Sequence, residues 1–505
     1  MSGTTNTFFQ NIVARYKVDP HSYLRQPDES ETHYWFRRMG HLKPVELMWS
    51  ESEVAGLRRV LNAAQLVYVG IGGIIGTGIF VLSGQAAAVN AGPAITISYV
   101  IAGVAAAVGW SGYLVRFFEV AFNVYFSKAW TQPTVVWSEV PPAVTYDPGC
   151  YFNIPGFVVV IMATILLCLG IKEAAWVNAT VVLIKIIVIL LFVVSLCGFV
   201  DKSNYIPYIP PNTGDWHFFG VPGVFAGASV VFFSYIGFDA VSTTALEAKN
   251  PRRDVPVGII GSLGISTFLY VAVCVIMTGA APYTELDVAT PVTVAVDAVE
   301  AKTLRSWRWL NIIVALGALC GLTSVMIIYL LAQSRVFYAM GQDGLLPSWL
   351  SRIHPRFKTP YRATILVGTI TAVLAAVMPI DLLGNMTSVG TLLAYFGVHI
   401  GVIVLRFTRP EVERRFRIPG GKYISLLFPI GGMAICLLLV AVAEVTTIWR
   451  LFIWMAIGWM VYFGYGIRHS RFNRDPIGRF EEAKAQRRSI FQMDELPQCS
   501  RDSRV

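Results

Sequence analysis

The sequence predicts an all-α integral membrane protein with many transmembrane helices. Of its 505 residues, 55% are hydrophobic and only 14% are charged, a balance that soluble domains of this size do not show. The hydrophobic residues gather in runs of about 20, the length that a helix needs to cross a bilayer. Lys and Arg residues gather in the short loops between these runs, as the positive-inside rule predicts for cytoplasmic loops. The net charge of +9 therefore reflects membrane topology, and we expect no nucleic-acid partner.

Eleven apolar runs are candidate spans. Residues 1–56, which precede them, are polar and charged, and we expect a cytoplasmic tail without a cleavable signal peptide. Residues 468–505 should form a second cytoplasmic tail, which leaves residues 57–467 as the membrane domain. The runs cover residues 64–88, 94–115, 154–171, 175–199, 222–247, 258–281, 308–333, 362–380, 385–405, 424–443 and 448–467.

Basic loops set the expected orientation. Clusters of Lys and Arg follow the fifth, seventh, ninth and eleventh runs, so these four loops should all be cytoplasmic. Arg58 and Arg59, just before the first run, place the N-terminal tail on the same side. From an inside N-terminus, however, the fifth run would end outside. One crossing is therefore missing between Phe80 and Ile154. Residues 113–130 cannot supply it, because charged side chains interrupt them.

The stretch Val69–Phe80 is the first candidate for a broken helix. It reads V-G-I-G-G-I-I-G-T-G-I-F and holds five glycines, each of which costs a helix interior about 1 kcal/mol relative to alanine. Irregular backbone at membrane depth is tolerated only where protein buries it or a water-filled cavity adjoins it. The freed N–H groups and the positive end of the next half-helix would suit a carboxylate. The alternative is a continuous helix that uses its glycines for close packing.

The run 222–247 is the second candidate, because Gly237 and Asp239 lie in its middle. A carboxylate at the bilayer centre costs about 2.5–3.5 kcal/mol even on insertion scales, so it normally faces a cavity or a partner. Asp239 could equally bond helix ends for structure alone. The neighbouring rings of Phe233, Tyr235 and Phe238 could form a wall over a ligand or pack in the ordinary way.

Lys185 is the third candidate. It lies near the centre of the run 175–199, too deep for its ammonium group to reach either membrane surface easily. Burial disfavours the charged form of a lysine, so Lys185 could carry a proton or stand in place of a bound cation. The alternative is a lysine that backbone carbonyls hold for structure alone. Two glycine-interrupted runs favour a substrate site near the midplane of an inverted-repeat transporter.

Four motifs follow one another along the chain: G-I-G-G-I-I-G-T-G-I-F, F-F-S-Y-I-G-F-D-A-V-S-T-T-A-L-E-A-K-N-P-R-R-D-V-P, S-R-V-F-Y-A-M-G-Q-D-G-L-L-P and R-F-R-I-P-G. Together they closely resemble the amino acid–polyamine–organocation (APC) transporter superfamily, and most of all its cationic amino acid transporter branch. The resemblance covers about residues 57–468. It implies an inverted-repeat (LeuT-like) helical bundle, in which two repeats of five helices place the unwound first and sixth helices around the substrate.

The resemblance also implies roles for individual residues. Phe233, Ile236 and Asp239 would line one half of the substrate site. Lys185 matches the lysine that, in proton-coupled members, occupies the sodium position of sodium-coupled relatives. Residues 335–347 would form the inner loop after the eighth helix. Backbone groups for the substrate's α-amino and α-carboxylate groups would come from Ile71, Gly72, Gly73, Gly76, Thr77 and Gly78.

The chain departs from the family between its first and third expected helices. Its two interrupted runs are the first and the fifth, whereas the resemblance implies that they should be the first and the sixth. This difference of one helix agrees with the crossing that the basic loops show to be missing. Residues 95–105 resemble the start of the family's second helix and residues 108–114 the end of its third. About 40–60 residues are therefore expected to be missing around Ala105–Gly109 on bilayer lengths, leaving about 11 apparent spans where 12 are expected. Either the fused segment is re-entrant, or the first helices insert the other way round, or the chain is a splice form or a flawed gene model.

The leading hypothesis is a secondary active amino acid transporter, proton-coupled, for cationic amino acids, that works by alternating access. The alternative is a nutrient sensor or a non-transporting splice isoform that binds amino acids without flux. We do not expect an enzyme, because the histidines form no metal-ligand spacing and no nucleophile stands beside a base. The expected partners are an amino acid substrate, protons and the lipid bilayer, with no cofactor and no metal. We expect the plasma membrane, or a vacuolar or other internal membrane, with both termini cytoplasmic.

Overall fold

In the computed structural model, the described residues are 30, 61–76, 79, 135–139, 142–146, 152–212, 214, 219–232, 234–288, 290–377, 380–408, 421–441 and 445–470. Most of them are helical, which confirms the predicted fold class. The α-helices are α4 (Ala63–Ile74), α8 (Ile154–Leu169), α9 (Ile171–Leu196), α10 (Gly220–Val231), α11 (Ala240–Thr243), α12 (Pro251–Ala280), α13 (Pro291–Thr303), α14 (Arg308–Gln342), α15 (Tyr361–Val377), α16 (Ile380–Thr408), α17 (Gly421–Ala441), α18 (Val445–Val461) and α19 (Ile467–His469). Shorter helical turns are η6 (Cys197–Phe199), η7 (Lys202–Tyr205), η8 (Ala245–Glu247), η9 (Tyr283–Glu285), η10 (Ser348–Ser351) and η11 (Tyr462–Gly466).

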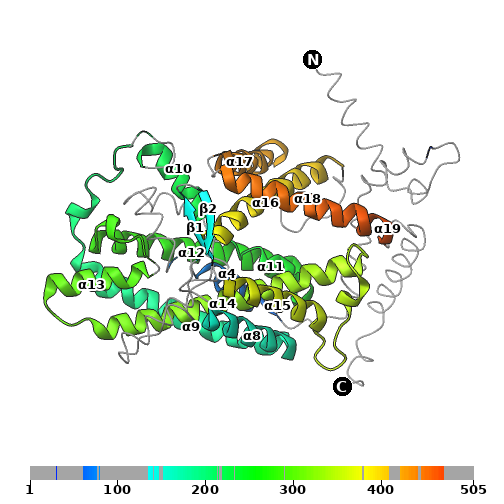
Figure 1. The fold of residues 1–505 in the computed structure, drawn as a ribbon, viewed down its shortest axis with the longest axis horizontal. Helices are drawn as coiled ribbons and strands as arrows, with labels where there is room; N and C mark the ends of the chain where they lie inside the picture. Colours follow the sequence, from blue (N-terminus) through cyan, green and yellow to red (C-terminus); the bar gives the residue numbers. More distant parts are fainter. Residues whose placement is uncertain are drawn as a thin grey trace, which may run out of the picture.

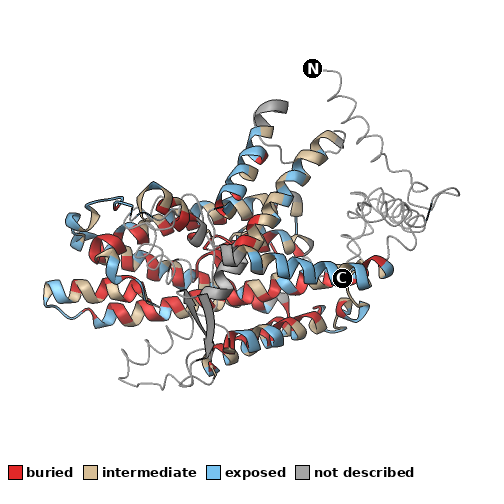
Figure 2. Ribbon diagram, turned by 45° about the horizontal axis from the view of Figure 1, so that its top comes forward, coloured by how far each residue is buried: buried red, intermediate tan, exposed pale blue. Residues whose placement is uncertain are grey.

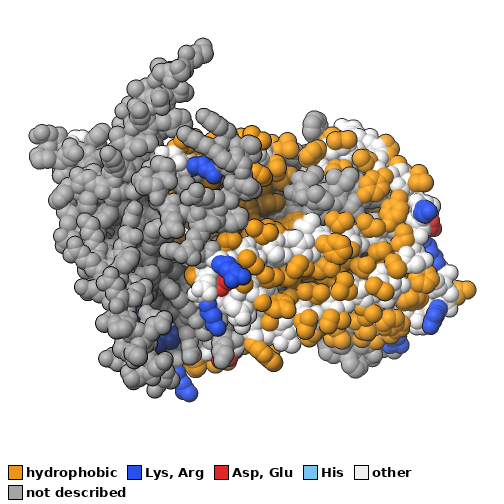
Figure 3. All heavy atoms as spheres, turned by 180° about the vertical axis from the view of Figure 1, so that it is seen from behind, with side chains coloured by type: hydrophobic (Ala, Val, Ile, Leu, Met, Phe, Trp, Pro, Cys, Tyr) orange, Lys and Arg blue, Asp and Glu red, His pale blue; other side chains and the backbone are white. Residues whose placement is uncertain are grey.

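Within the described ranges, five helices are long and apolar enough to cross a membrane; they lie at Glu173–Phe199, Arg253–Ala280, Arg308–Gln342, Val389–Phe407 and Leu451–His469. Large hydrophobic side chains on their outer faces are exposed, for example Trp176 at 71% and Phe268 at 71%. Figure 3 shows such side chains as a broad band across the described face, with Lys and Arg side chains toward its two ends. An apolar surface of this extent suits lipid, and the number of spans stays a prediction.

The predicted runs from residue 154 onward coincide with helices, and two of them differ in an informative way. The run 222–247 consists of α10, α11 and η8 with turns between them. The loop predicted at residues 335–347 is wrong over its first half, because α14 continues to Gln342. Ser334, Arg335, Tyr338 and Gly341 are buried in this part of α14, so the helix stays packed past the end of the hydrophobic run. The run 94–115 and most of the segment with the missing crossing lie outside the described residues, as do the two tails apart from residues 30 and 468–470.

Two elements of the structure were not predicted from the sequence. A hairpin joins β1 (Val135–Glu139) to β2 (Pro142–Tyr146), with Val135 opposite Tyr146. The helix α13 follows α12 in a connecting segment, and its Asp297 and Glu300 hide it from a search for apolar runs. Both elements are too short or too charged to resemble a membrane span.

The helix α4 lies in the middle of the bundle, and it contacts α12, α9, α14 and α11 (Figure 1). Buried residues follow the facing sides of these helices, whereas exposed residues follow their outer sides (Figure 2). Burial reaches 67% for the apolar part of α14 but 11% for that of α16. Two hydrophobic clusters meet at α4, one through Ile71 and Ile74 and the other through Leu66 and Val69. A break in α4 therefore lies at the centre of the fold.

Candidate functional site

The first helix of the described chain ends inside the glycine stretch. Asn62 and Gln65 form a capping box at its start, where each side chain accepts a hydrogen bond from the other's backbone N–H at 2.9 and 3.0 Å. The helix ends at Ile74, because Ile75 is extended, with φ −77° and ψ 101°. Gly76, which is buried, follows the break. Thr77 and Gly78 lie outside the described residues.

The glycines before the break serve close packing. A Cβ atom on Gly70 would collide with Ser262 of α12, and one on Gly72 would lie 2.5 Å from Oδ1 of Asn178 in α9. Gly73 faces the second interrupted helix. Both alternatives for this stretch therefore hold in part, since packed glycines in α4 precede an actual break.

The second interruption lies between α10 and α11. The helix α10 ends at Val231, and residues 234–239 form turns in which Gly237 has a φ of +125°. Asp239 caps α11: its Oδ1 accepts hydrogen bonds from the N–H of Gly237 at 2.9 Å and of Ala240 at 3.1 Å. One carboxylate oxygen thus has the structural role that the sequence left open. Phe233 lies outside the described residues.

The two interruptions lie against each other. A Cβ atom on Gly73 would lie 3.0 Å from the Cα of Gly237. Tyr270 of α12 lies beside both, because its hydroxyl oxygen is 2.5 Å from the carbonyl oxygen of Ile74 and 2.6 Å from that of Ser234. The single phenolic proton is shared between carbonyl groups that the broken helices have released. Tyr270 is fully buried and so ties the two breaks together.

Lys185 also binds the first break. Its Nζ lies 3.0 Å from the carbonyl oxygen of Ile71, 3.2 Å from that of Gly72 and 2.6 Å from that of Ile75, and 2.7 Å from Oγ of Ser324 in α14. The side chain is 0% exposed. An ammonium group among carbonyl and hydroxyl oxygens has the environment that proteins give to hard metal cations. This geometry is compatible with both interpretations of Lys185: a group that takes the place of a bound cation, and a lysine that backbone carbonyls hold for structure alone.

The other aromatic residues of this region pack in pairs. The ring of Tyr235 meets that of Tyr270 at 5.4 Å. Phe238 meets Tyr395 of α16 at 5.4 Å, and the hydroxyl of Tyr395 is buried without a hydrogen-bond partner. Tyr329 donates its hydroxyl proton to the carbonyl oxygen of Ile236 at 2.7 Å.

Sequence reasoning missed several residues at this site. Hydroxyl groups within apolar runs are the only signal that the sequence carried for them, and that signal is common in ordinary membrane helices. The missed residues are Tyr270, Ser324, Tyr329 and Tyr395.

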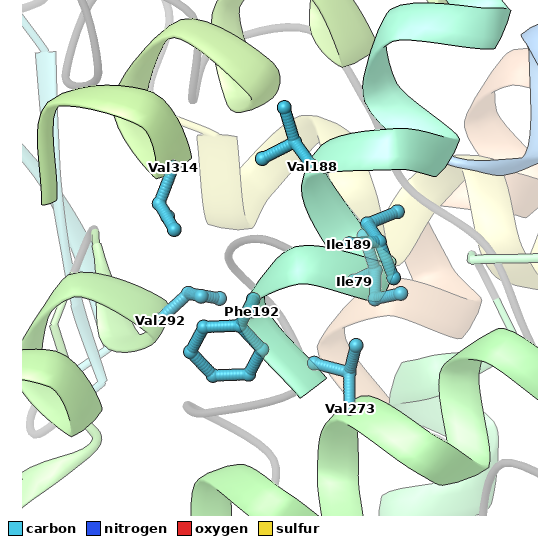
Figure 4. A pocket seen from close by; sticks show the side chains of 7 residues that line it. All are labelled: Ile79, Val188, Ile189, Phe192, Val273, Val292 and Val314. Carbon is cyan, nitrogen blue, oxygen red and sulfur yellow. The ribbon is translucent and has the colours of Figure 1, made fainter. Parts of the chain in front are cut away.

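A small cavity beside Lys185 is unsuited to an amino acid. Figure 4 shows apolar side chains converging on it from α9, α12, α13 and α14. Val188 and Ile189 lie one helical turn from Lys185. Because the described residues that line the cavity are all apolar, they offer nothing to the charged groups of a substrate. The lining residues are Ile79, Val188, Ile189, Phe192, Val273, Val292 and Val314.

Helices interrupted side by side within an apolar bundle are typical of multi-pass membrane transporters. A family model described as amino acid permease matches residues 104–462. The methylthioribose transporter of Bacillus subtilis (strain 168) is 36% identical over 472 residues, which cover 86% of this chain and 98% of the relative. The branched-chain amino acid permease BcaP of the same organism is 38% identical over 474 residues, 85% of this chain and 97% of the relative.

The vacuolar cationic amino acid transporter 4 of Arabidopsis thaliana is 34% identical over 395 residues, which cover 70% of this chain and 64% of the relative. This chain therefore spans less than two thirds of the plant protein's length. The chain belongs to the amino acid permease family of the APC superfamily. It is a multi-pass integral membrane protein for amino acid transport.

Proposed function

We propose that the chain is a proton-coupled secondary transporter that works by alternating access around its two interrupted helices. The observation that carries the proposal is the position of Lys185, whose Nζ has four oxygen neighbours at the first break. When protonated, a lysine there can bind the carbonyl oxygens at the break as a cation would. When deprotonated, it can release them. Such a group links the proton to the conformation of the site.

The proposed substrate site lies where the two interruptions meet. Gly76, Thr77 and Gly78 would present backbone N–H groups to the substrate's carboxylate, at the start of the half-helix after the break. Ile71, Gly72 and Gly73 would line the same substrate site. The carbonyl groups of Ile71 and Gly72 already accept hydrogen bonds from Lys185. The other half would come from Phe233, Ile236 and Asp239.

The proposed substrates are cationic amino acids. Asp239 supports this choice, because the backbone N–H groups bind its Oδ1 and its other oxygen can face a positive charge. The plant relatives are named as cationic amino acid transporters, whereas the two bacterial relatives carry other substrates in their names. The proposal of cationic substrates therefore depends on Asp239.

Uptake into liposomes tests the coupling. Purified full-length chain, with radiolabelled lysine outside, should accumulate lysine faster when a proton gradient is imposed. Lys185→Ala should reduce uptake at least tenfold and leave the remainder insensitive to the gradient. Lys302→Met, which removes an exposed lysine, is the control and should keep both properties. Gradient-driven uptake by folded Lys185→Ala protein would contradict the role of Lys185.

A second candidate is a form that binds amino acids without flux. Its support is the length of the alignments. The alignment with the methylthioribose transporter has 472 positions but covers 86% of the 505 residues, about 434, so about 38 of its positions have no residue of this chain. The same calculation for BcaP leaves about 45 positions, from 85% of the chain and 474 aligned residues. Both numbers are close to the 40–60 residues expected to be missing near Ala105–Gly109, and we propose that the gaps lie there.

Binding and flux separate the two candidates. Isothermal titration with lysine, together with liposome uptake, should give both binding and flux for a transporter, but binding alone for the second candidate. Sequencing the transcript across Val104–Trp110 shows whether the cell makes the short form. An extra in-frame segment there would remove the second candidate.

The proposed topology places residues 1–56 and 468–505 in the cytoplasm and residues 57–467 in the membrane. The plasma membrane is the proposed location, with the vacuolar membrane as the alternative that the names of the plant relatives support. Protease protection of terminal tags in sealed vesicles tests the orientation, and fluorescence microscopy of a tagged chain tests the compartment.

A further inference from the structure

Glu247 and Arg335 form a buried ion pair away from the two interruptions. Nη2 of Arg335 lies 2.7 Å from Oε1 of Glu247, and the side chains are only 6% and 2% exposed. Glu247 is the last residue of η8, which follows α11, whereas Arg335 lies in α14. The ion pair between Lys302 and Asp201 is, by contrast, about half exposed and longer, at 3.7 Å. The buried pair therefore joins two elements of the bundle where water is excluded.

The bonding of this pair is incomplete. Oε2 of Glu247 and Nε of Arg335 are buried and have no hydrogen-bond partner. Arginine and a carboxylate bind most strongly through two parallel hydrogen bonds, which this pair does not form. A buried charge that keeps an unsatisfied atom costs free energy, so this pair is held together less strongly than a fully bonded one. The pair is thus suited to a contact that opens and closes.

The same Glu247 is tied to α4 through its backbone. The N–H of Leu61 donates to the carbonyl oxygen of Glu247 at 3.0 Å, and the N–H of Lys249 donates to that of Leu61 at 2.8 Å. Leu61 and Ala248 thereby form a parallel β-bridge, and both are buried, at 1% and 0% exposure. Leu61 immediately precedes the capping residue of α4. The start of α4 and the end of η8 are therefore joined by backbone hydrogen bonds, which side-chain changes do not remove.

We infer that Glu247 and Arg335 are positioning residues for transport, which hold α4 and the α11–η8 segment against α14 as a latch. The backbone bridge makes α4 and α11–η8 one moving unit. The side-chain ion pair then decides whether this unit lies against α14 at the end where α4 begins. This inference rests on the proposed alternating-access cycle, because the latch acts on the helices that flank the site, but its test needs no substrate.

Distances between spin labels test the latch in the full-length chain, with its native cysteines replaced. Suitable label positions are exposed: Ala64 on α4, Lys249 after η8 and Val336 on α14. In Arg335→Met protein, the distances from residue 336 to residues 64 and 249 should both gain a longer population. The distance between residues 64 and 249 should keep its original distribution, because the bridge remains.

Three further variants complete the test. Lys302→Met breaks the exposed ion pair and should leave all three distances unchanged. Glu247→Arg combined with Arg335→Glu restores a pair with exchanged charges and should restore the short population. Glu247→Gln keeps a hydrogen-bond acceptor and should give a smaller opening in the same direction, which also serves if Arg335→Met does not fold.

Two outcomes would overturn the inference. Unchanged distances in folded Arg335→Met protein would show that the ion pair holds nothing. A distance between residues 64 and 249 that broadens as much as the others would show that the two segments move separately. Failure of proton-driven uptake would instead count against the proposed function, and it leaves these distances untouched.

Discussion

Gly73 and Gly237 bring the backbones of two interrupted helices into contact at the centre of the bundle. A Cβ atom on Gly237 would lie 2.5 Å from the carbonyl carbon of Gly73, where no side-chain movement could relieve the overlap. The φ of +125° at Gly237 is one that residues with a side chain rarely adopt. The approach of the two breaks therefore depends on the absence of a side chain at both positions.

Gly237→Ala should destabilise the protein strongly. The unfavourable φ costs about 1–2 kcal/mol and overpacking adds about 1–3 kcal/mol, so thermal unfolding in detergent should shift down by several degrees. Gly264→Ala is the matched control, because Gly264 lies in α12 with open space around the position of its Cβ. That control should unfold at the same or a slightly higher temperature. Equal unfolding temperatures for Gly237→Ala and the parent would refute the close contact.

Tyr270→Phe should separate the two breaks. The change removes the hydroxyl between the carbonyl groups of Ile74 and Ser234 and leaves both buried, at a cost of about 1–3 kcal/mol. Hydrogen exchange should increase near Ile75 and Tyr235, where amides follow those carbonyl groups. Tyr205→Phe is the control, since it also removes a hydroxyl from a carbonyl of α12, that of Val275. If hydrogen exchange near Ile75 and Tyr235 increased equally in both variants, Tyr270 would have no special role in joining the two breaks.

Asp239→Asn should separate capping from charge. An asparagine keeps the side-chain oxygen that caps α11 but carries no charge, and it caps helices about as well as aspartate. If the charge selects the substrate, uptake of lysine should fall at least tenfold while uptake of leucine changes less than twofold. Asp239→Ala, which also loses the cap, should reduce stability as well. Equal lysine uptake by Asp239→Asn and the parent would leave Asp239 with a structural role alone.

Local features of the sequence were sufficient for much of this fold. Apolar runs from residue 154 onward became helices, because membrane insertion depends on the hydropathy of a single segment. The glycines of Val69–Phe80, together with Gly237 and the carboxylate of Asp239, indicated where helices end. The depth of Lys185 in its run predicted its full burial. Each of these properties depends on residues close together in the chain.

Contacts between distant segments were beyond the reach of the sequence. Tyr270 meets Ile74 from 196 positions away, and Ser324 meets Lys185 from 139 positions away. The sequence likewise gave no reason to pair Glu247 with Arg335. A tyrosine or a serine in an apolar run, or an arginine just after one, has many available partners, and the packing of helices selects among them.

Hydropathy and glycine placement thus assigned the class of protein, most of its helices and the two interruptions. Packing alone brought those interruptions together and surrounded Lys185 with oxygen atoms. The physical reason is the range of each effect: burial in lipid and backbone strain act within one segment, whereas a hydrogen bond within a membrane bundle needs the correct depth and rotation of two helices at once.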